Sequence, residues 1–141
     1  MIIRDESEML ALGEKIGEEV QAKVGSGDSV VIEMIGDVGA GKTTLTRGIA
    51  RGLGVKEAVT SPSFTLSKRY GFPDGSLIHY DFYRLDEPGI LAETLEETIN
   101  EPKTVSIVEW GESVNEILPE KHMVIKISYN EDETRTVEIL K

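Results

Sequence analysis

Eight consecutive residues fit the pattern G-x-x-x-x-G-K-[ST], in which a glycine-rich loop encloses phosphate groups. They are Gly36, Asp37, Val38, Gly39, Ala40, Gly41, Lys42 and Thr43. Glycine leaves room for backbone N–H groups to touch phosphate oxygens, which a Cβ atom would hold at a distance. The lysine reaches the β- and γ-phosphates, and the threonine hydroxyl takes one place around Mg²⁺. The pattern therefore predicts a site for a nucleoside triphosphate and Mg²⁺.

The residues on either side of this loop support the prediction. Ser29–Ile35 is a mostly apolar run of strand length. After the loop, Leu45, Ile49 and Leu53 recur every four residues, which is the spacing of one helix face. Gly54 stands where a helix commonly ends. A glycine turn without a ligand is the alternative, but the strand before it and the helix after it favour a phosphate site.

The composition narrows the classes of protein and partner. The chain has 141 residues, a formal net charge of −11 and no cysteine. This length fits a single domain over residues 1–141, and the lack of cysteine excludes a disulfide framework and a thiolate zinc site. The acidic charge argues against a broad nucleic-acid-binding face, so we expect no DNA partner. We also expect no membrane partner and a cytoplasmic location, because the sequence shows neither a span-length apolar run nor an export signal.

The expected elements alternate between helices and strands. In chain order they are a helix from Glu6 to Val24, the strand and helix around the loop, an antiparallel strand pair at Phe64–Tyr70 and Leu77–Tyr83, a helix at Glu87–Ile99, a strand at Thr104–Glu109 and a hairpin of Met123–Ser128 with Thr134–Leu140. Asp5 is expected to cap the first helix, with Glu8 at the spacing of a capping box. This order predicts an α/β fold, a three-layer P-loop NTPase domain whose central sheet mixes parallel and antiparallel strands.

A phosphate-binding loop needs a second acidic group for Mg²⁺ or its waters, usually where a neighbouring strand ends. Glu109 ends the apolar strand Val105–Val108 and fits this role, the alternative being a carboxylate that only reaches solvent. Asp81 is the second candidate. The alternation of side chains along a strand places His79 and Asp81 on one face. That pair either faces the nucleotide or forms a hydrogen bond at the surface of the sheet.

Hydroxyl and aromatic residues add two weaker signals. Ser61, Ser63 and Thr65 follow the loop helix, where nucleotide switches place the segment that senses the γ-phosphate. A hydroxyl-rich turn is the simpler interpretation of the same residues. Trp110 is either a core aromatic residue or, because it follows Glu109, a side chain against the nucleotide or a partner.

Four blocks of residues together resemble one known family. They are Gly36–Thr44, Ser61–Leu66, His79–Leu85 and Val108–Trp110. In this order and spacing they resemble the bacterial TsaE (YjeE) family. These are small P-loop ATPases required for N6-threonylcarbamoyladenosine at position 37 of tRNAs that read ANN codons. The resemblance covers nearly the whole chain, and the set of four blocks is far more specific than the loop alone.

The resemblance implies a role and a partner. TsaE proteins bind the TsaD–TsaB complex, in which TsaD moves the threonylcarbamoyl group to tRNA. ATP binding and hydrolysis by TsaE keep that complex turning over. The resemblance therefore implies an accessory ATPase with low activity of its own, which meets tRNA only indirectly.

Family roles also carry over to individual residues. The loop and Thr44 are expected to bind ATP, and Thr43 and Glu109 to hold Mg²⁺. We expect Lys42, Asp81 and Glu109 to form the catalytic set, while the three hydroxyl residues after the helix act as a switch loop.

One stretch departs from the family pattern, since the leucine–glycine pair that often follows the third block is missing here. The helix in that region, and any partner contact it makes, therefore need not match the family.

Two other functions fit the loop. A small-molecule kinase needs arginines over the acceptor phosphate, but Lys103 is the only basic residue between Arg84 and Lys121. A nucleotide-dependent binding switch is the other, and the lack of an Asn-Lys-x-Asp guanine motif favours ATP over GTP. Arg84 and an arginine from a partner are the two candidates for a transition-state cation. Met9 and Arg135 are the candidates for contact with adenine, from their expected places near the sheet edges.

Overall fold

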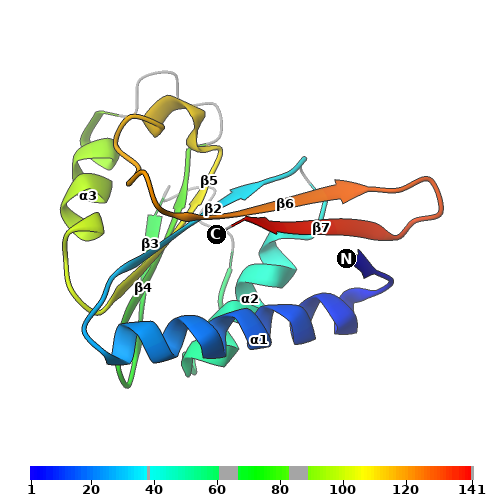
Figure 1. Cartoon of the computed structure of the whole chain (residues 1–141), viewed down its shortest axis with the longest axis horizontal. Coiled ribbons are helices and arrows are strands. Elements are labelled where there is room, and N and C mark those ends of the chain that lie inside the picture. The colour runs from blue at the N-terminus through cyan, green and yellow to red at the C-terminus, as the bar shows by residue number, and fades with distance from the viewer. Residues whose placement is uncertain (38, 61–66, 83–88, 141) are drawn as a thin grey trace.

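Seven strands form one sheet in the part of the chain that the computed structural model describes, residues 1–37, 39–60, 67–82 and 89–140 (Figure 1). The strands are β1 (Ile2–Ile3), β2 (Val30–Ile35), β3 (Ser67–Phe72), β4 (Gly75–Asp81), β5 (Thr104–Glu109), β6 (Met123–Tyr129) and β7 (Arg135–Leu140). The helices are α1 (Glu6–Gly25), α2 (Lys42–Leu53), α3 (Gly89–Ile99) and the short 3₁₀ helix η1 (Gly111–Val114).

The strand order in the sheet is β1-β7-β6-β2-β5-β4-β3. The central strands β6, β2, β5 and β4 run parallel, whereas β3 and β7 pair antiparallel with their neighbours. Long connections through α3 and η1 let β4, β5 and β6 run in one direction, while short turns join β3 to β4 and β6 to β7. The predicted mixed sheet is therefore confirmed.

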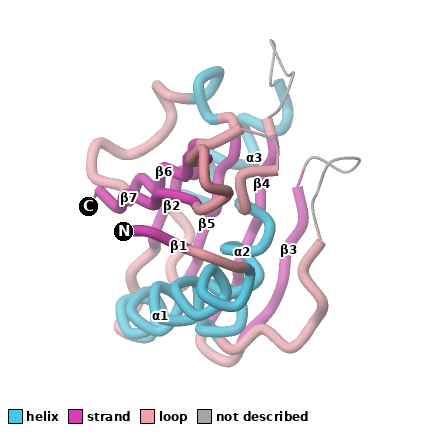
Figure 2. The backbone as a smooth tube through the Cα atoms, turned by 90° about the vertical axis from the view of Figure 1, so that its right-hand side faces the viewer, coloured by secondary structure: helices cyan, strands magenta, loops and turns pink. Residues whose placement is uncertain are grey.

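Helices cover both faces of the sheet, with α1 and α2 side by side on one of them (Figure 2). The α1–α2 face has a core that includes Leu45, Ile49 and Ile107. On the other face, α3 and η1 pack over Tyr80 and Phe82. Across the described part of the chain, no helix combines the length and apolar character that a membrane span needs. The three layers predicted from the sequence are confirmed.

The helices α1 and α2 approach so closely that glycine is required where they cross. A Cβ atom on Gly13 would lie 2.6 Å from the carbonyl oxygen of Leu45 and 2.7 Å from the Cα atom of Gly48. One turn further along, Gly17 and Gly52 face each other in the same way. This crossing holds α2, and with it the loop at its N-terminus, against α1.

The helices and strands lie where the sequence predicts them, but several boundaries differ; β4, for example, ends at Asp81 and not at the predicted Tyr83. Asp5 caps α1 as predicted, since its side chain accepts a hydrogen bond from the Glu8 backbone N–H at 2.9 Å. The sequence does not predict β1, because two residues show no readable periodicity. The turn between β3 and β4 is shorter than the predicted Gly71–Gly75 segment, since strand pairing continues to Phe72 and Gly75.

Candidate nucleotide-binding site

The glycine-rich loop begins where the central parallel strands end. β2 ends at Ile35, and the neighbouring strand β5 ends at Glu109, which pairs with Met34 in the sheet register. β4 ends at Asp81, which pairs with Glu109. The two acids predicted for the site therefore lie at the carboxyl ends of adjacent strands, on the side of the sheet where the loop begins. Open α/β sheets bind their ligands at the carboxyl ends of their strands.

The N-terminus of α2 carries backbone N–H groups that no described side chain caps. Gly41 occupies the N-cap position, with φ at 112° and no side chain to accept a hydrogen bond. The helix ladder starts with the bond from Leu45 N–H to the Gly41 carbonyl at 2.9 Å. The N–H groups of Lys42, Thr43 and Thr44 therefore have no acceptor within the helix. A phosphate group satisfies such an end and is attracted by the helix dipole.

Close packing explains why two positions of the loop are glycine. A Cβ atom on Gly36 would lie 2.7 Å from the Ile127 carbonyl oxygen in β6. At Gly41, the positive φ would strain any residue with a side chain, and the Met9 methyl carbon would lie only 3.0 Å from an added Cβ atom. The Arg135 side chain lies 3.9 Å from the same added atom. Met9 and Arg135, the two residues predicted to contact adenine, thus both border the loop.

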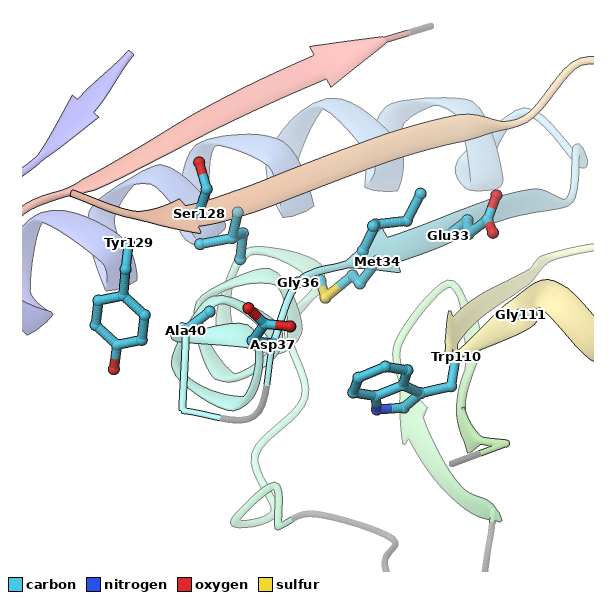
Figure 3. A pocket seen from close by; sticks show the side chains of 11 residues that line it. Glu33, Met34, Gly36, Asp37, Ala40, Trp110, Gly111, Ser128 and Tyr129 are labelled. Atoms are coloured by element: carbon cyan, nitrogen blue, oxygen red, sulfur yellow. The ribbon is translucent and has the colours of Figure 1, made fainter. Parts of the chain in front are cut away.

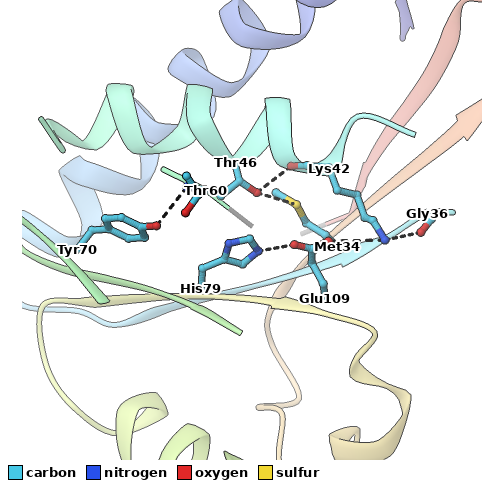
Figure 4. Close-up of polar contacts among 8 residues, drawn as sticks. All are labelled: Met34, Gly36, Lys42, Thr46, Thr60, Tyr70, His79 and Glu109. Carbon is cyan, nitrogen blue, oxygen red and sulfur yellow. Dashed lines mark hydrogen bonds and ion pairs between the residues drawn. The ribbon is translucent and has the colours of Figure 1, made fainter. Parts of the chain in front are cut away.

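The Lys42 side chain folds back over the loop (Figure 4). Its Nζ atom donates to the Gly36 carbonyl at 2.6 Å and lies 3.6 Å from Glu109 Oε1. The centre of the Trp110 ring lies 4.2 Å from the same atom. Lys42 is consequently only 6% exposed. The ammonium group stands between the loop and the acid, which is where a phosphate group and its Mg²⁺ meet in P-loop proteins.

A buried hydrogen bond joins Glu109 to His79, whose Nε2 donates to Glu109 Oε2 (Figure 4). Burial alone would raise the pKa of Glu109. The hydrogen bond and charge of His79, together with the charge of Lys42, outweigh burial and lower the pKa of Glu109 below its ordinary value. The carboxylate is therefore ionised at neutral pH and suited to a cation. The other ring nitrogen of His79, Nδ1, has no hydrogen-bond partner among the described residues.

His79 and Asp81 lie two positions apart on β4, on the same face by the alternation of side chains. The hydrogen bond that the structure describes for His79 runs to Glu109 on the neighbouring strand. Residues two positions apart on one strand are roughly 7 Å apart. Glu109, on the adjacent strand, is within reach of the ring because β4 and β5 pair directly.

Five predicted site residues lie outside the described part of the chain: Val38, Ser61, Ser63, Thr65 and Arg84. The predicted switch segment follows Thr60. The Thr60 backbone N–H donates to the Tyr70 hydroxyl at 3.3 Å, and its own hydroxyl accepts from Lys68 Nζ at 3.4 Å. The residue that precedes the segment is therefore tied to β3.

A pocket of about 370 Å³ opens beside the loop, at the carboxyl ends of β2 and β6 (Figure 3). Trp110 and Gly111 border one end of it and Tyr129 the other, with Gly36 and Asp37 between them. Trp110 has φ at 57°, which turns the chain from β5 into η1. Trp110, predicted to be either a core residue or an aromatic residue of the site, therefore borders a pocket beside the loop.

A second acid–histidine pair, which the sequence patterns do not predict, joins Glu33, a residue that lines this pocket, to His122, which does not. His122 Nδ1 lies 2.7 Å from the Pro119 carbonyl, and its Nε2 lies 3.0 Å from Glu33 Oε1. The carbonyl only accepts, so Nδ1 is the donor in the bond to Pro119. The only signal of this pair in the sequence is Glu33, a charged residue inside an otherwise apolar strand.

Comparisons with known proteins agree with this geometry. The family model described as "Threonylcarbamoyl adenosine biosynthesis protein TsaE" matches residues 3–137. The chain belongs to the TsaE family. The TsaE protein of Haemophilus influenzae is 35% identical over 138 residues, which cover 98% of this chain and 86% of that protein. The TsaE protein of Bacillus subtilis is 40% identical over 112 residues, which cover 79% of this chain and 68% of that protein.

A solved structure agrees as well. The crystal structure of YdiB from Bacillus subtilis matches this chain with a TM-score of 0.78 at 29% identity, covering 97% of this chain and 80% of that one. The resemblance that the four sequence blocks carry is therefore confirmed. The TsaE relatives are named as tRNA threonylcarbamoyladenosine biosynthesis proteins, so the family acts in that tRNA modification.

Proposed function

We propose that this TsaE chain binds ATP with Mg²⁺ and hydrolyses it, and thereby supports a TsaD–TsaB complex in forming N6-threonylcarbamoyladenosine on tRNA. The observation that carries the proposal is the uncapped N-terminus of α2 with Lys42 and the ionised Glu109 directly beside it. A helix dipole, an ammonium group and a metal-binding carboxylate are what a polyphosphate with Mg²⁺ needs.

Thr43 and Glu109 are the residues that would hold Mg²⁺, directly or through water. Thr43 lies in the first turn of α2, next to Lys42, and Glu109 ends the adjacent strand β5. When bound, the metal offsets the negative charge on the β- and γ-phosphates. Lys42 exchanges the Gly36 carbonyl for phosphate oxygens, and His79 orients the Glu109 carboxylate as an outer partner.

Asp81 is the candidate for orienting the attacking water or the switch segment. It is 8% exposed and pairs with Glu109 in the register of β4 and β5. A carboxylate at that place accepts a hydrogen bond from water without displacing the metal ligand. The transition-state cation comes from Arg84 or from the partner complex, so turnover of the isolated chain is expected to be low and to rise with the partner.

Contact with tRNA is proposed to pass through the partner complex. The chain carries a formal net charge of −11, and a field of that sign repels the phosphate backbone at long range. The partner must therefore supply most of the binding surface for tRNA.

The proposal is tested with the purified full chain and purified TsaD–TsaB complex. The chain is immobilised and the retained complex is measured with a non-hydrolysable ATP analogue, with ADP and without nucleotide. We expect retention to depend on the nucleotide, to disappear in Lys42→Ala and to persist in Lys56→Ala, which removes an exposed lysine from the loop after α2. No retention under any condition would contradict the partner. In a separate assay with hydrolysable ATP, transfer of the phosphate group to a small molecule, in place of release of free phosphate, would instead support a kinase.

A further inference from the structure

The hairpin of β6 and β7 carries two side chains that act as a unit. Tyr129 and Arg135 face each other where the hairpin leaves its turn. The Arg135 guanidinium stacks over the Tyr129 ring at 4.3 Å, and its Nη2 atom donates to the Tyr129 hydroxyl at 3.0 Å. A third contact, from Nη1 to the Glu133 carbonyl at 3.1 Å, fixes the guanidinium to the turn. The pair is thus oriented by the hairpin itself.

Both members of this pair reach the phosphate-binding loop. The Tyr129 hydroxyl donates to the Gly39 carbonyl, and Arg135 Nε donates to the Ala40 carbonyl at 3.1 Å. Figure 3 shows the Tyr129 side chain beside the Ala40 end of the loop. Two consecutive carbonyl groups of the loop are therefore held on the hairpin side.

The contacts to the two carbonyl groups also fix the directions of the N–H groups that follow them in the chain. In a trans peptide, the C=O group and the N–H group of the next residue point in opposite directions. The Ala40 N–H, opposite the Gly39 carbonyl, closes an internal turn onto Asp37 O at 3.0 Å. The Gly41 N–H, opposite the Ala40 carbonyl, donates to no described residue and points away from Arg135. The Gly41 N–H is therefore directed toward the uncapped N-terminus of α2, where an anion would bind.

We propose that Tyr129 and Arg135 are positioning residues that hold the Gly39 and Ala40 carbonyls, so that the turn closed by the Ala40 N–H keeps its shape and the Gly41 N–H stays aimed at the phosphates. This inference rests on the proposed nucleotide binding and adds the residues that organise the loop beforehand. Preorganised donors bind an anion more tightly because no ordering occurs at the moment of binding. Loss of one such hydrogen bond is expected to weaken polyphosphate binding about three- to tenfold.

The test compares two removals of a single tyrosine hydroxyl in the full chain. Tyr129→Phe removes the bond to the loop, together with the bond that the hydroxyl accepts from Arg135 Nη2, from a residue that is 52% exposed. The matched control is Tyr80→Phe, which removes a buried hydroxyl bonded to Thr98 at 2.9 Å on the α3 face of the sheet. Affinities for ATP and for inorganic tripolyphosphate are measured by titration calorimetry, and the midpoint of thermal unfolding by scanning calorimetry.

Tyr129→Phe should weaken ATP and tripolyphosphate binding by the same factor while the thermal midpoint stays near the wild-type value. Tyr80→Phe should show the reverse, a lower midpoint with unchanged affinities. Arg135→Lys, which keeps the charge but loses the guanidinium fork, should also weaken both ligands. Moreover, the Gly41 amide resonance of the free protein should shift in Tyr129→Phe and not in Tyr80→Phe.

Unchanged tripolyphosphate affinity in Tyr129→Phe would overturn the inference, and a loss confined to ATP would assign Tyr129 to the adenosine part instead. Either result would leave the proposed function standing, because the wild-type chain would still bind ATP. Failure of the wild-type chain to bind ATP and tripolyphosphate would refute both.

Discussion

Replacing Gly13 by alanine tests whether the glycine crossing of α1 and α2 positions the phosphate loop. The added Cβ atom would lie 2.6 Å from Leu45 O and 2.7 Å from the Gly48 Cα, while ordinary contact begins at 3.4 Å. Both neighbours are backbone atoms, so the helices must separate by roughly 0.8 Å. Overpacking of this kind costs about 1–3 kcal/mol. Alanine recovers about 0.5–1 kcal/mol through its better helix propensity.

The expected net result, from the middles of these two ranges, is a loss of about 1 kcal/mol in the free energy of unfolding. Urea unfolding followed by the fluorescence of Trp110, the single tryptophan, measures it. The matched control is Gly25→Ala at the end of α1, where the nearest atom to an added Cβ is Gln21 Nε2 at 3.9 Å. That variant should be as stable as the wild type or slightly more stable. Equal stability of Gly13→Ala and Gly25→Ala would refute the close crossing. ATP affinity should also fall in Gly13→Ala, since the displaced helix carries Lys42.

Three further predictions concern charge. Glu109→Gln should reduce single-turnover ATP hydrolysis by orders of magnitude and weaken the Mg²⁺ dependence of ATP binding, whereas Asp81→Asn should lower hydrolysis and leave Mg²⁺-dependent affinity intact. The opposite pattern would exchange the two roles. The chain alone should bind tRNA weakly in a filter assay, because its net charge is −11, and tight, salt-sensitive binding would contradict this. Folding lowers the pKa of Glu109 from an ordinary value of 4.5, so its stabilising effect is complete above that value and is lost as the pH falls through the folded-state pKa. As the pH falls below 4.5, the free energy of unfolding of Glu109→Gln should therefore decrease less steeply than that of the wild type, and equal slopes would contradict the pairing.

The strand and the helix that flank the glycine-rich loop were predictable because each has a local signature. The glycine spacing, the apolar strand before Gly36 and the helical stripe after Thr43 all lie within one short stretch. The acid Glu109 was predictable for a similar reason, since it ends an apolar strand that the sheet must place beside β2. Local patterns and one rule about strand ends are sufficient for these assignments.

The partners of these residues were not predictable, because they join distant parts of the chain. The contact from Tyr129 to Gly39 spans 90 positions, and that from His122 to Glu33 spans 89. Periodicity indicates the face on which a side chain lies but not the residue that it meets. His79 illustrates this limit, since its face was predicted correctly and its bond to Glu109 was not.

The most direct test of the central claim is Mg²⁺-dependent ATP binding by the full chain, measured by titration calorimetry for the wild type, Lys42→Ala and Lys56→Ala. Lys42 is buried against the Gly36 carbonyl and Glu109 at the mouth of the loop, whereas Lys56 is exposed in the segment after α2. We predict that the wild type and Lys56→Ala bind ATP alike, and that Lys42→Ala remains folded but loses most of its affinity and all hydrolysis. ATP binding and hydrolysis by Lys42→Ala at wild-type levels would contradict the assignment of this loop as the phosphate site.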